Sequence, residues 1–283
     1  MSNALSQPSA TAPASALPAH FPVWMYTLVA LGLCVLIAWI IACLIRRRKF
    51  VEAAGPGRRS RLNVLHIILP MLCTFAATGV ASYFLPHVPP YSLITMAIGT
   101  VMLMAASLVA GAYGFPLGLS RGMGLSGRHW LYDSVRGVLG YLGILPVCMA
   151  AIEITTRLMT AWGYHSPEHP LLEILRNPDA SRLSCTLAVV TAVILAPLTE
   201  EIFYRGLLQT ALRRQFRPWP AIVLTALLFS FMHIGAPSSV PAILVFGMAL
   251  GYQYERTGRL WAPVVMHVIF NAVFVTLTIT TPA

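Results

Sequence analysis

Apolar residues form long runs along most of the chain, and short segments rich in Pro, Gly or Arg separate these runs. Several runs reach about 20 residues, the length that an α-helix needs to cross the hydrocarbon core of a bilayer. The pattern predicts an all-α, polytopic membrane protein with about eight membrane-spanning helices. Their expected bounds are Val23–Ile45, Val64–Leu85, Tyr91–Ala112, Trp130–Ile154, Leu183–Leu212, Pro220–Ile234, Pro241–Tyr254 and Leu260–Ile279.

Composition supports this fold class and excludes a soluble globular domain. Of the 283 residues, 57% are hydrophobic and only 10% are charged. Soluble domains carry about a quarter charged residues, so most of this surface is not suited to water. We therefore expect the lipid bilayer to surround the outer faces of the helices.

The positive charge of the chain, +10, is concentrated in loops. Seven of the 19 basic residues lie at 46–61, between the first two expected spans, and further arginines follow spans three, five and seven. Loops rich in Lys and Arg stay on the cytoplasmic side, so this alternation predicts a multi-pass protein of the plasma (inner) membrane with both termini outside. No aromatic residues that could stack on bases are interleaved with these charges, so no nucleic-acid partner is expected.

The chain divides into three expected regions. Residues 1–22 are rich in Ala, Pro and Ser and lack Lys and Arg, which predicts a disordered tail rather than a cleaved signal peptide. Residues 23–182 hold the first four helices, and residues 183–283 hold the other four with all the candidate chemistry. In the loop before the fifth span, the run Leu171–Leu175 is expected to form a short interfacial helix. The five cysteines show no metal-ligand spacing and are expected to fill the core.

Three ionisable residues, Glu200, Glu201 and Arg205, interrupt the fifth apolar segment. Each unpaired ionisable group at the bilayer centre costs about 2.5–3.5 kcal/mol, so these residues must pair or line a polar cavity inside the protein. Glu201 and Arg205 can pair along one helix face, while Glu200 points about 100° away and stays free for chemistry. Pro197 removes a backbone hydrogen bond just upstream, and a kink there would open a wet pocket beside Glu200.

Two histidines and an asparagine lie in the later apolar segments: His233 in the sixth, and His267 with Asn271 on one face of the eighth. A neutral imidazole can accept a proton, and Asn and His side chains can donate hydrogen bonds to an oxyanion. Counted from their own turns, Glu200 and His233 lie at one depth, whereas His267 lies roughly 10 Å closer to its turn. These groups can meet only if the first hairpin projects further from the membrane than the second.

Taken in order along the chain, these residues resemble the three-motif signature of the CPBP family of intramembrane proteases, which includes the CAAX-prenyl endopeptidases. The motifs are Glu200-Glu201-x-x-x-Arg205, Phe229-x-x-x-His233 and His267-x-x-x-Asn271. The resemblance extends from about Leu183 to Asn271 and includes the intervening Gly247-x-x-x-Gly251, which by itself indicates close helix packing.

The resemblance implies an intramembrane endopeptidase that acts on a membrane protein or a membrane-anchored peptide. By that resemblance, Glu200 and His233 would activate a water molecule, and His267 with Asn271 would stabilise the oxyanion of the tetrahedral intermediate. Glu201 and Arg205 would hold the first motif in place. This mechanism needs no cofactor.

Other functions stay open from the residues alone. A glutamate, His233 and His267 could hold a catalytic zinc ion, although the HExxH pattern is absent and two histidines seldom hold such zinc without a third ligand. We favour the metal-free mechanism. Intramembrane Glu and His also occur in transporters, and a non-catalytic membrane scaffold could retain the same motifs.

Overall fold

The computed structural model describes residues 22–46, 60–125, 127–164 and 170–280, and no strand occurs within these ranges. The tail expected at 1–22 lies outside them except for Pro22, as does most of the basic loop at 46–61. The elements before the fifth span are α1 (Val23–Arg46), α2 (Val64–Phe84), α3 (Tyr91–Gly114), α4 (Leu119–Gly122), the 3₁₀ turn η1 (Gly127–His129), α5 (Trp130–Ala161) and α6 (Pro170–Arg176). The elements after it are α10 (Pro218–Phe231), the 3₁₀ turn η4 (Pro237–Ser239), α11 (Val240–Thr257) and α12 (Trp261–Thr280).

The fifth span is one continuous helical run of mixed winding from Arg182 to Leu212. It consists of α7 (Arg182–Val190), the π-helical η2 (Thr191–Leu195), α8 (Ala196–Glu200), the π-helical η3 (Glu201–Gln209) and α9 (Thr210–Leu212).

All eight expected segments are helical, and the polytopic all-α membrane fold is confirmed. The largest difference is at α5, which continues to Ala161 instead of ending at Ile154. Six helical stretches of the described chain are long and apolar enough to cross a membrane. The other two are α10, with 14 residues, and α11, with 18. At ~1.5 Å per residue α10 spans only about 21 Å, less than a typical hydrocarbon core, so its crossing of the bilayer stays a prediction, as does that of α11.

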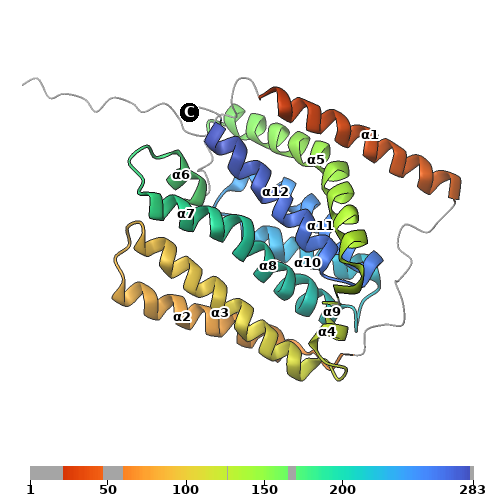
Figure 1. The fold of residues 1–283 in the computed structure, drawn as a ribbon, viewed down its shortest axis with the longest axis horizontal. Helices are drawn as coiled ribbons and strands as arrows, with labels where there is room; N and C mark the ends of the chain where they lie inside the picture. The colour runs from red at the N-terminus through yellow and green to blue at the C-terminus, as the bar shows by residue number, and fades with distance from the viewer. Residues whose placement is uncertain (1–21, 47–59, 126, 165–169, 281–283) are drawn as a thin grey trace, which may run out of the picture.

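The helices lie side by side in layers (Figure 1). The run from α7 to α9 packs with α10, α11 and α12 in the middle of the molecule, and the α2–α3 hairpin covers it on one side through α3. On the other side α5 packs against α11 and α12, and α1 packs on α5 as the outermost helix. The first residue of α1 and the last of α12 lie at the same end of the bundle, as eight helices in alternation require.

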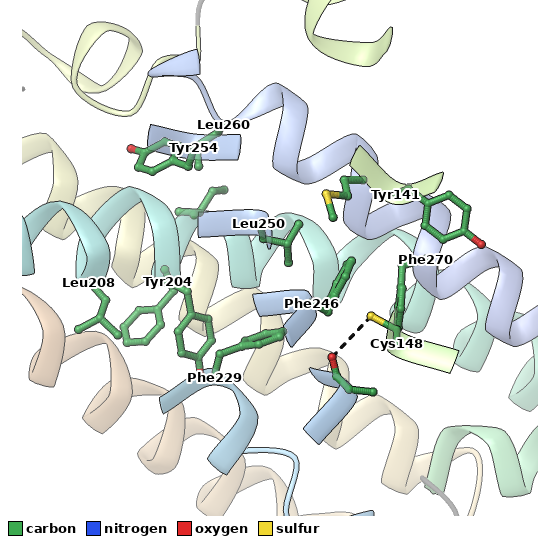
Figure 2. Close-up of a cluster of buried hydrophobic side chains, with 14 of the residues drawn as sticks. Tyr141, Cys148, Tyr204, Leu208, Phe229, Phe246, Leu250, Tyr254, Leu260 and Phe270 are labelled. Atoms are coloured by element: carbon green, nitrogen blue, oxygen red, sulfur yellow. Dashed lines mark hydrogen bonds between the residues drawn. The ribbon is translucent and has the colours of Figure 1, made fainter. Parts of the chain in front are cut away.

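The hydrophobic core lies mainly between α5 and the last four expected spans. Figure 2 shows its centre, where aromatic and aliphatic side chains from η3, α10, α11 and α12 meet those of α5. Cys148 is fully buried there, and its thiol donates to the Ala242 carbonyl at 3.7 Å. The expectation that all five cysteines fill the core is wrong for the other four, which lie partly or fully exposed on the helices. An apolar helix surface that faces lipid accepts a thiol as readily as a core does.

Polar contacts join the start of α5 to the turn between α11 and α12. Both carboxylate oxygens of Asp133, which has no exposed surface, accept hydrogen bonds from Arg259, from Nε at 2.6 Å and from Nη2 at 2.6 Å. These bonds raise the pKa of the Arg259 guanidinium above its ordinary value. Gln253 Nε2 also donates to the Arg136 carbonyl at 3.1 Å, and Trp261 Nε1 to Ser134 Oγ at 2.8 Å. Asp133 thus forms part of the packing between helices.

The glycine pair of α11 allows close packing, as the Gly247-x-x-x-Gly251 spacing predicts. A Cβ atom at Gly247 would come within 3.2 Å of the Ala226 Cβ on α10, and one at Gly251 within 2.8 Å of Gln209 Oε1 on η3. Small residues at these two positions therefore let α11 approach both neighbouring helices.

We predict that Arg259→Ala lowers the stability of the detergent-solubilised protein, because it leaves the buried Asp133 carboxylate without its partner. Breaking a buried ion pair costs about 3–5 kcal/mol, and we expect the lower end because Arg259 is 23% exposed. The matched control is Arg157→Ala, which removes the arginine of the exposed Glu153–Arg157 pair and should change stability little. Thermal unfolding followed by intrinsic fluorescence measures both variants. Equal losses of stability would contradict the larger contribution that we assign to the Asp133–Arg259 pair.

Candidate functional site

The helical run that carries the first motif changes its winding around Pro197. In a π-helix each N–H donates to the carbonyl five residues back, and the Ala196 N–H accordingly donates to the Thr191 carbonyl. The next residue, Pro197, has no N–H to donate. Neither residue therefore supplies a hydrogen bond to the Ala192 carbonyl, which in an α-helix would accept from residue 196. The sequence predicts only a kink here, and the π-helical winding is a finding of the structure.

Glu201 is the centre of a buried cluster of ionisable groups. Its Oε1 accepts a hydrogen bond from Arg205 Nη1 at 2.9 Å and another from His267 Nδ1 at 2.8 Å. The side chains of Glu201 and Arg205 have no exposed surface, and that of His267 is 4% exposed. The predicted Glu201–Arg205 pair is present, and His267 is a third member that sequence reasoning does not include. A carboxylate only accepts hydrogen bonds, so His267 donates from Nδ1 and directs Nε2 elsewhere.

Arg205 extends this cluster to α11 and α10. Its Nη2 donates to the Gly247 carbonyl at 3.2 Å, and its guanidinium lies over the Phe229 ring, with Cζ 4.8 Å from the ring centre. Cation–π contacts and charge-assisted hydrogen bonds both strengthen in a medium without water. The guanidinium of Arg205 thereby compensates the Glu201 carboxylate and links three helices.

Two further residues, Gln209 and Arg213, make polar contacts with α11 closer to its C-terminal end. Gln209 Nε2 donates to the Gly251 carbonyl at 3.1 Å and to Glu255 Oε1 at 3.0 Å. Arg213 Nε donates to Glu255 Oε2 at 3.2 Å. Sequence reasoning misses this network, although a signal exists. Polar residues at 205, 209 and 213 recur every four positions, and so do the residues that they contact at 247, 251 and 255.

Glu200 faces a cavity of about 190 Å³ rather than the buried cluster. Its side chain is 23% exposed, and its Oε2 lies 3.7 Å from Nε2 of His267. That separation is too long for a direct hydrogen bond. Glu200 is therefore placed as the sequence predicts, next to the Glu201–Arg205 pair and free of it.

His233 lies two residues beyond the end of α10 at Phe231, although the sequence places it inside the sixth span. Its Nδ1 donates to the Phe229 carbonyl at 2.8 Å, and its ring packs on that of Phe229 with centres 4.9 Å apart. In the neutral ring Nε2 is then an acceptor, and His233 lines the same cavity as Glu200. Between these two described residues no ion pair or direct hydrogen bond is formed, so any joint action on a water would be across the cavity.

Asn271 uses one of its amide protons to satisfy the π-helical segment. Its Nδ2 donates to the Ala192 carbonyl at 2.7 Å, the carbonyl that Pro197 leaves without a backbone donor. The side-chain amide carries a second proton on Nδ2, and Asn271 also lines the cavity. The hydrogen bond to Ala192 fixes the amide beside His267.

Apart from Ser239, the rest of the cavity wall is apolar. Phe229, Phe246 and Phe270 lie in one cluster from three helices (Figure 2), and the rings of Phe246 and Phe270 stack with centres 4.0 Å apart. Leu171 and Leu172 of α6 close another side, so the short helix predicted at Leu171–Leu175 is present and covers the cavity. Such walls keep the local dielectric low and strengthen electrostatic interactions inside.

One cavity is thus lined by four of the motif residues, Glu200, His233, His267 and Asn271, which come from three segments of the chain. The difference in membrane depth that the sequence predicts between His267 and Glu200 does not separate their side chains, which lie 3.7 Å apart. In the described ranges, no three His, Cys, Asp or Glu side chains are arranged to hold a metal ion.

Comparison with known proteins gives one match. Residues 182–273 match the family model described as type II CAAX prenyl endopeptidase Rce1-like. The matched segment covers about a third of the chain, and all six residues of the predicted site lie inside it. No curated protein and no solved structure matches the chain.

We predict that Arg205→Ala destabilises the protein, because Glu201 then keeps a buried negative charge with only His267 beside it. The expected loss is about 3–5 kcal/mol in thermal or chemical unfolding of the solubilised protein. Arg213→Ala is the control, since Arg213 is 26% exposed and pairs with Glu255 at the edge of the same network. It should cost clearly less. If Arg205→Ala left stability unchanged while it abolished activity, Arg205 would act on substrate instead.

Proposed function

We propose that this cavity hydrolyses a peptide bond, because residues 182–273 match the type II CAAX prenyl endopeptidase Rce1-like family model and the chain is a multi-pass membrane protein. The substrate would be a membrane protein or a membrane-anchored peptide. The observation that carries the proposal is the convergence of Glu200, His233, His267 and Asn271 on one cavity with apolar walls. A carboxylate that can accept a proton, an imidazole acceptor and two hydrogen-bond donors are the groups that amide hydrolysis needs.

The first step is activation of a water molecule in the cavity. Glu200 takes a proton from the water, and Nε2 of His233, which is an acceptor in the neutral ring, orients the water by accepting its second hydrogen. The resulting hydroxide attacks the carbonyl carbon of the substrate. General-base catalysis of this kind contributes typically 10²–10⁴-fold to a rate.

The second requirement is stabilisation of the oxyanion. His267 directs Nε2 into the cavity, because Nδ1 is bonded to Glu201, and with both ring nitrogens protonated Nε2 donates to the developing negative charge. The second Nδ2 proton of Asn271 provides the other donor, and the bond to Ala192 holds its amide in place.

Collapse of the intermediate completes the reaction. The C–N bond breaks, the leaving amine takes the proton that Glu200 removed from water, and Glu200 returns to its carboxylate form. Water supplies both the new carboxyl oxygen and the amine proton, so no redox step or cofactor enters. Glu201 and Arg205 act as positioning residues, because they touch His267 and the helices but not the cavity.

We predict that Glu200→Gln abolishes proteolysis and leaves the fold intact. The substitution keeps the size of the side chain and removes its capacity to accept a proton. Glu153→Gln is the matched control, since Glu153 belongs to an exposed pair outside the cavity and its loss should leave cleavage unchanged. Cleavage of a membrane-anchored reporter in proteoliposomes measures both variants. Near-normal proteolysis by Glu200→Gln would remove Glu200 from the mechanism, and a scaffold or transport function would gain support.

We predict that Asn271→Ala lowers kcat by about 10²–10³-fold with little change in KM, as loss of one oxyanion donor does elsewhere. The variant also leaves the Ala192 carbonyl without a partner, at a cost of about 1–3 kcal/mol in stability. Asn271→Asp retains the size but donates no hydrogen bond in its ionised form, so it should lose turnover to a similar extent.

Elemental analysis of the purified protein tests the zinc alternative beside these variants. We expect turnover to survive chelation. About one zinc per chain, lost with activity on chelation and restored with zinc, would overturn the metal-free assignment and make His233 and His267 metal ligands.

A further inference from the structure

A second cavity shares no lining residue with the proposed active site, although its Met266 is next in sequence to His267. Its volume is about 520 Å³, and it opens between α1, α5, α11 and one side chain of α12. We call it the α1–α5 pocket. The apolar part of its wall comes from Val35 and Leu36 of α1, Gly143 and Ile144 of α5, and Met266 of α12.

One end of this pocket is polar. Arg136 reaches it from α5 and donates from Nη1 to the Tyr132 hydroxyl at 3.0 Å. Its Nε is buried and has no hydrogen-bond partner, and among the described residues no carboxylate pairs with Arg136. An arginine in a membrane helix is costly unless its charge is compensated. A compensating anion is therefore expected at this end of the pocket.

Gln253 provides a second, independent sign of a ligand. Its side chain is 91% buried and lines the pocket from α11. Nε2 donates to the Arg136 carbonyl, but Oε1 is buried without any partner. A buried acceptor that lacks a donor is destabilising, and a hydroxyl group of a ligand would supply that donor.

The three features select one class of ligand. A guanidinium recognises phosphate, a free amide oxygen accepts from a hydroxyl, and the apolar wall accommodates an acyl chain. The polar end also lies where α5 begins and α11 ends, beside the Asp133–Arg259 pair, which is the position of a lipid headgroup relative to membrane helices. Basic pockets between such helices bind anionic headgroups.

We propose that the α1–α5 pocket binds an anionic phospholipid with a hydroxyl-bearing headgroup, of the phosphatidylglycerol type. The phosphate contacts Arg136, a headgroup hydroxyl donates to Gln253 Oε1, and one acyl chain fills the apolar part between α1 and α5. Because α1 packs mainly on α5, the lipid adds a contact between α1 and α11. The site is separate from the proposed active site, so it does not depend on that assignment.

Lipid binding to the full-length, delipidated protein in detergent tests this proposal. Phosphatidylglycerol should raise the unfolding temperature and appear as a retained adduct in native mass spectrometry. Phosphatidylcholine with the same chains has the phosphate but no headgroup hydroxyl, so it should bind about tenfold more weakly, the equivalent of one hydrogen bond. Inorganic phosphate at the same concentration should not stabilise the protein. Equal effects of the two lipids, or of free phosphate, would overturn the assignment.

Two variants and one control locate the site. Arg136→Ala should weaken the binding of both lipids, because both carry the phosphate, while Arg217→Ala, at an exposed arginine outside the pocket, should leave their binding unchanged. Gly143→Leu should also weaken both lipids, because a Cβ at Gly143 meets only Val35 Cγ1 at 3.7 Å and a longer side chain would enter the pocket. If Arg136→Ala left lipid binding unchanged, or Arg217→Ala weakened it equally, the binding would be a general effect of surface charge and the proposed site would be wrong.

Discussion

The rest of the site depends on one buried carboxylate. Glu201 has no exposed surface inside an apolar helical bundle, and an uncompensated charge there would be very unfavourable. Arg205 compensates the charge from the same helical run, and His267 brings in α12. Arg205 also bonds to α11 and lies over Phe229 of α10. Burying this carboxylate therefore requires four helices to meet in one arrangement, which is the arrangement that places His267 beside Glu200.

A second constraint comes from Pro197. Its missing N–H, together with π-helical winding, leaves the Ala192 carbonyl without a backbone donor, and Asn271 supplies the donor from α12. Backbone polar groups in a membrane interior must be satisfied within the protein, so this contact holds α12 against the π-helical segment η2. The amide that satisfies the backbone is also the amide that faces the cavity. Asn271 therefore has both a structural role and a proposed catalytic role.

The two halves of the chain use polar groups differently. In the later spans, from residue 182 onward, buried polar residues form two groups against α11, and the group around Glu201 reaches the cavity through His267. In the first half, α1 and α2 present apolar surfaces of which little is buried. Polar contacts of the first part with the later helices include those of Asp133, Ser134 and Arg136 on α5 and a hydrogen bond from Thr199 to the Thr100 carbonyl of α3. The first helices consequently adapt to lipid, while the later ones hold the chemistry.

The sequence by itself determined the helical membrane fold, the approximate bounds of eight helices, the Glu201–Arg205 pair and four polar residues that line the cavity. Apolar run length, four-residue spacing and the cost of intramembrane charge depend on local sequence, so they can be inferred without coordinates. Only the tertiary structure decided that His267 bonds to Glu201, that Asn271 satisfies Ala192 and that His233 lies beyond the end of α10. These contacts join residues far apart in the chain, and no local periodicity encodes which helices face each other or where a helix changes its winding.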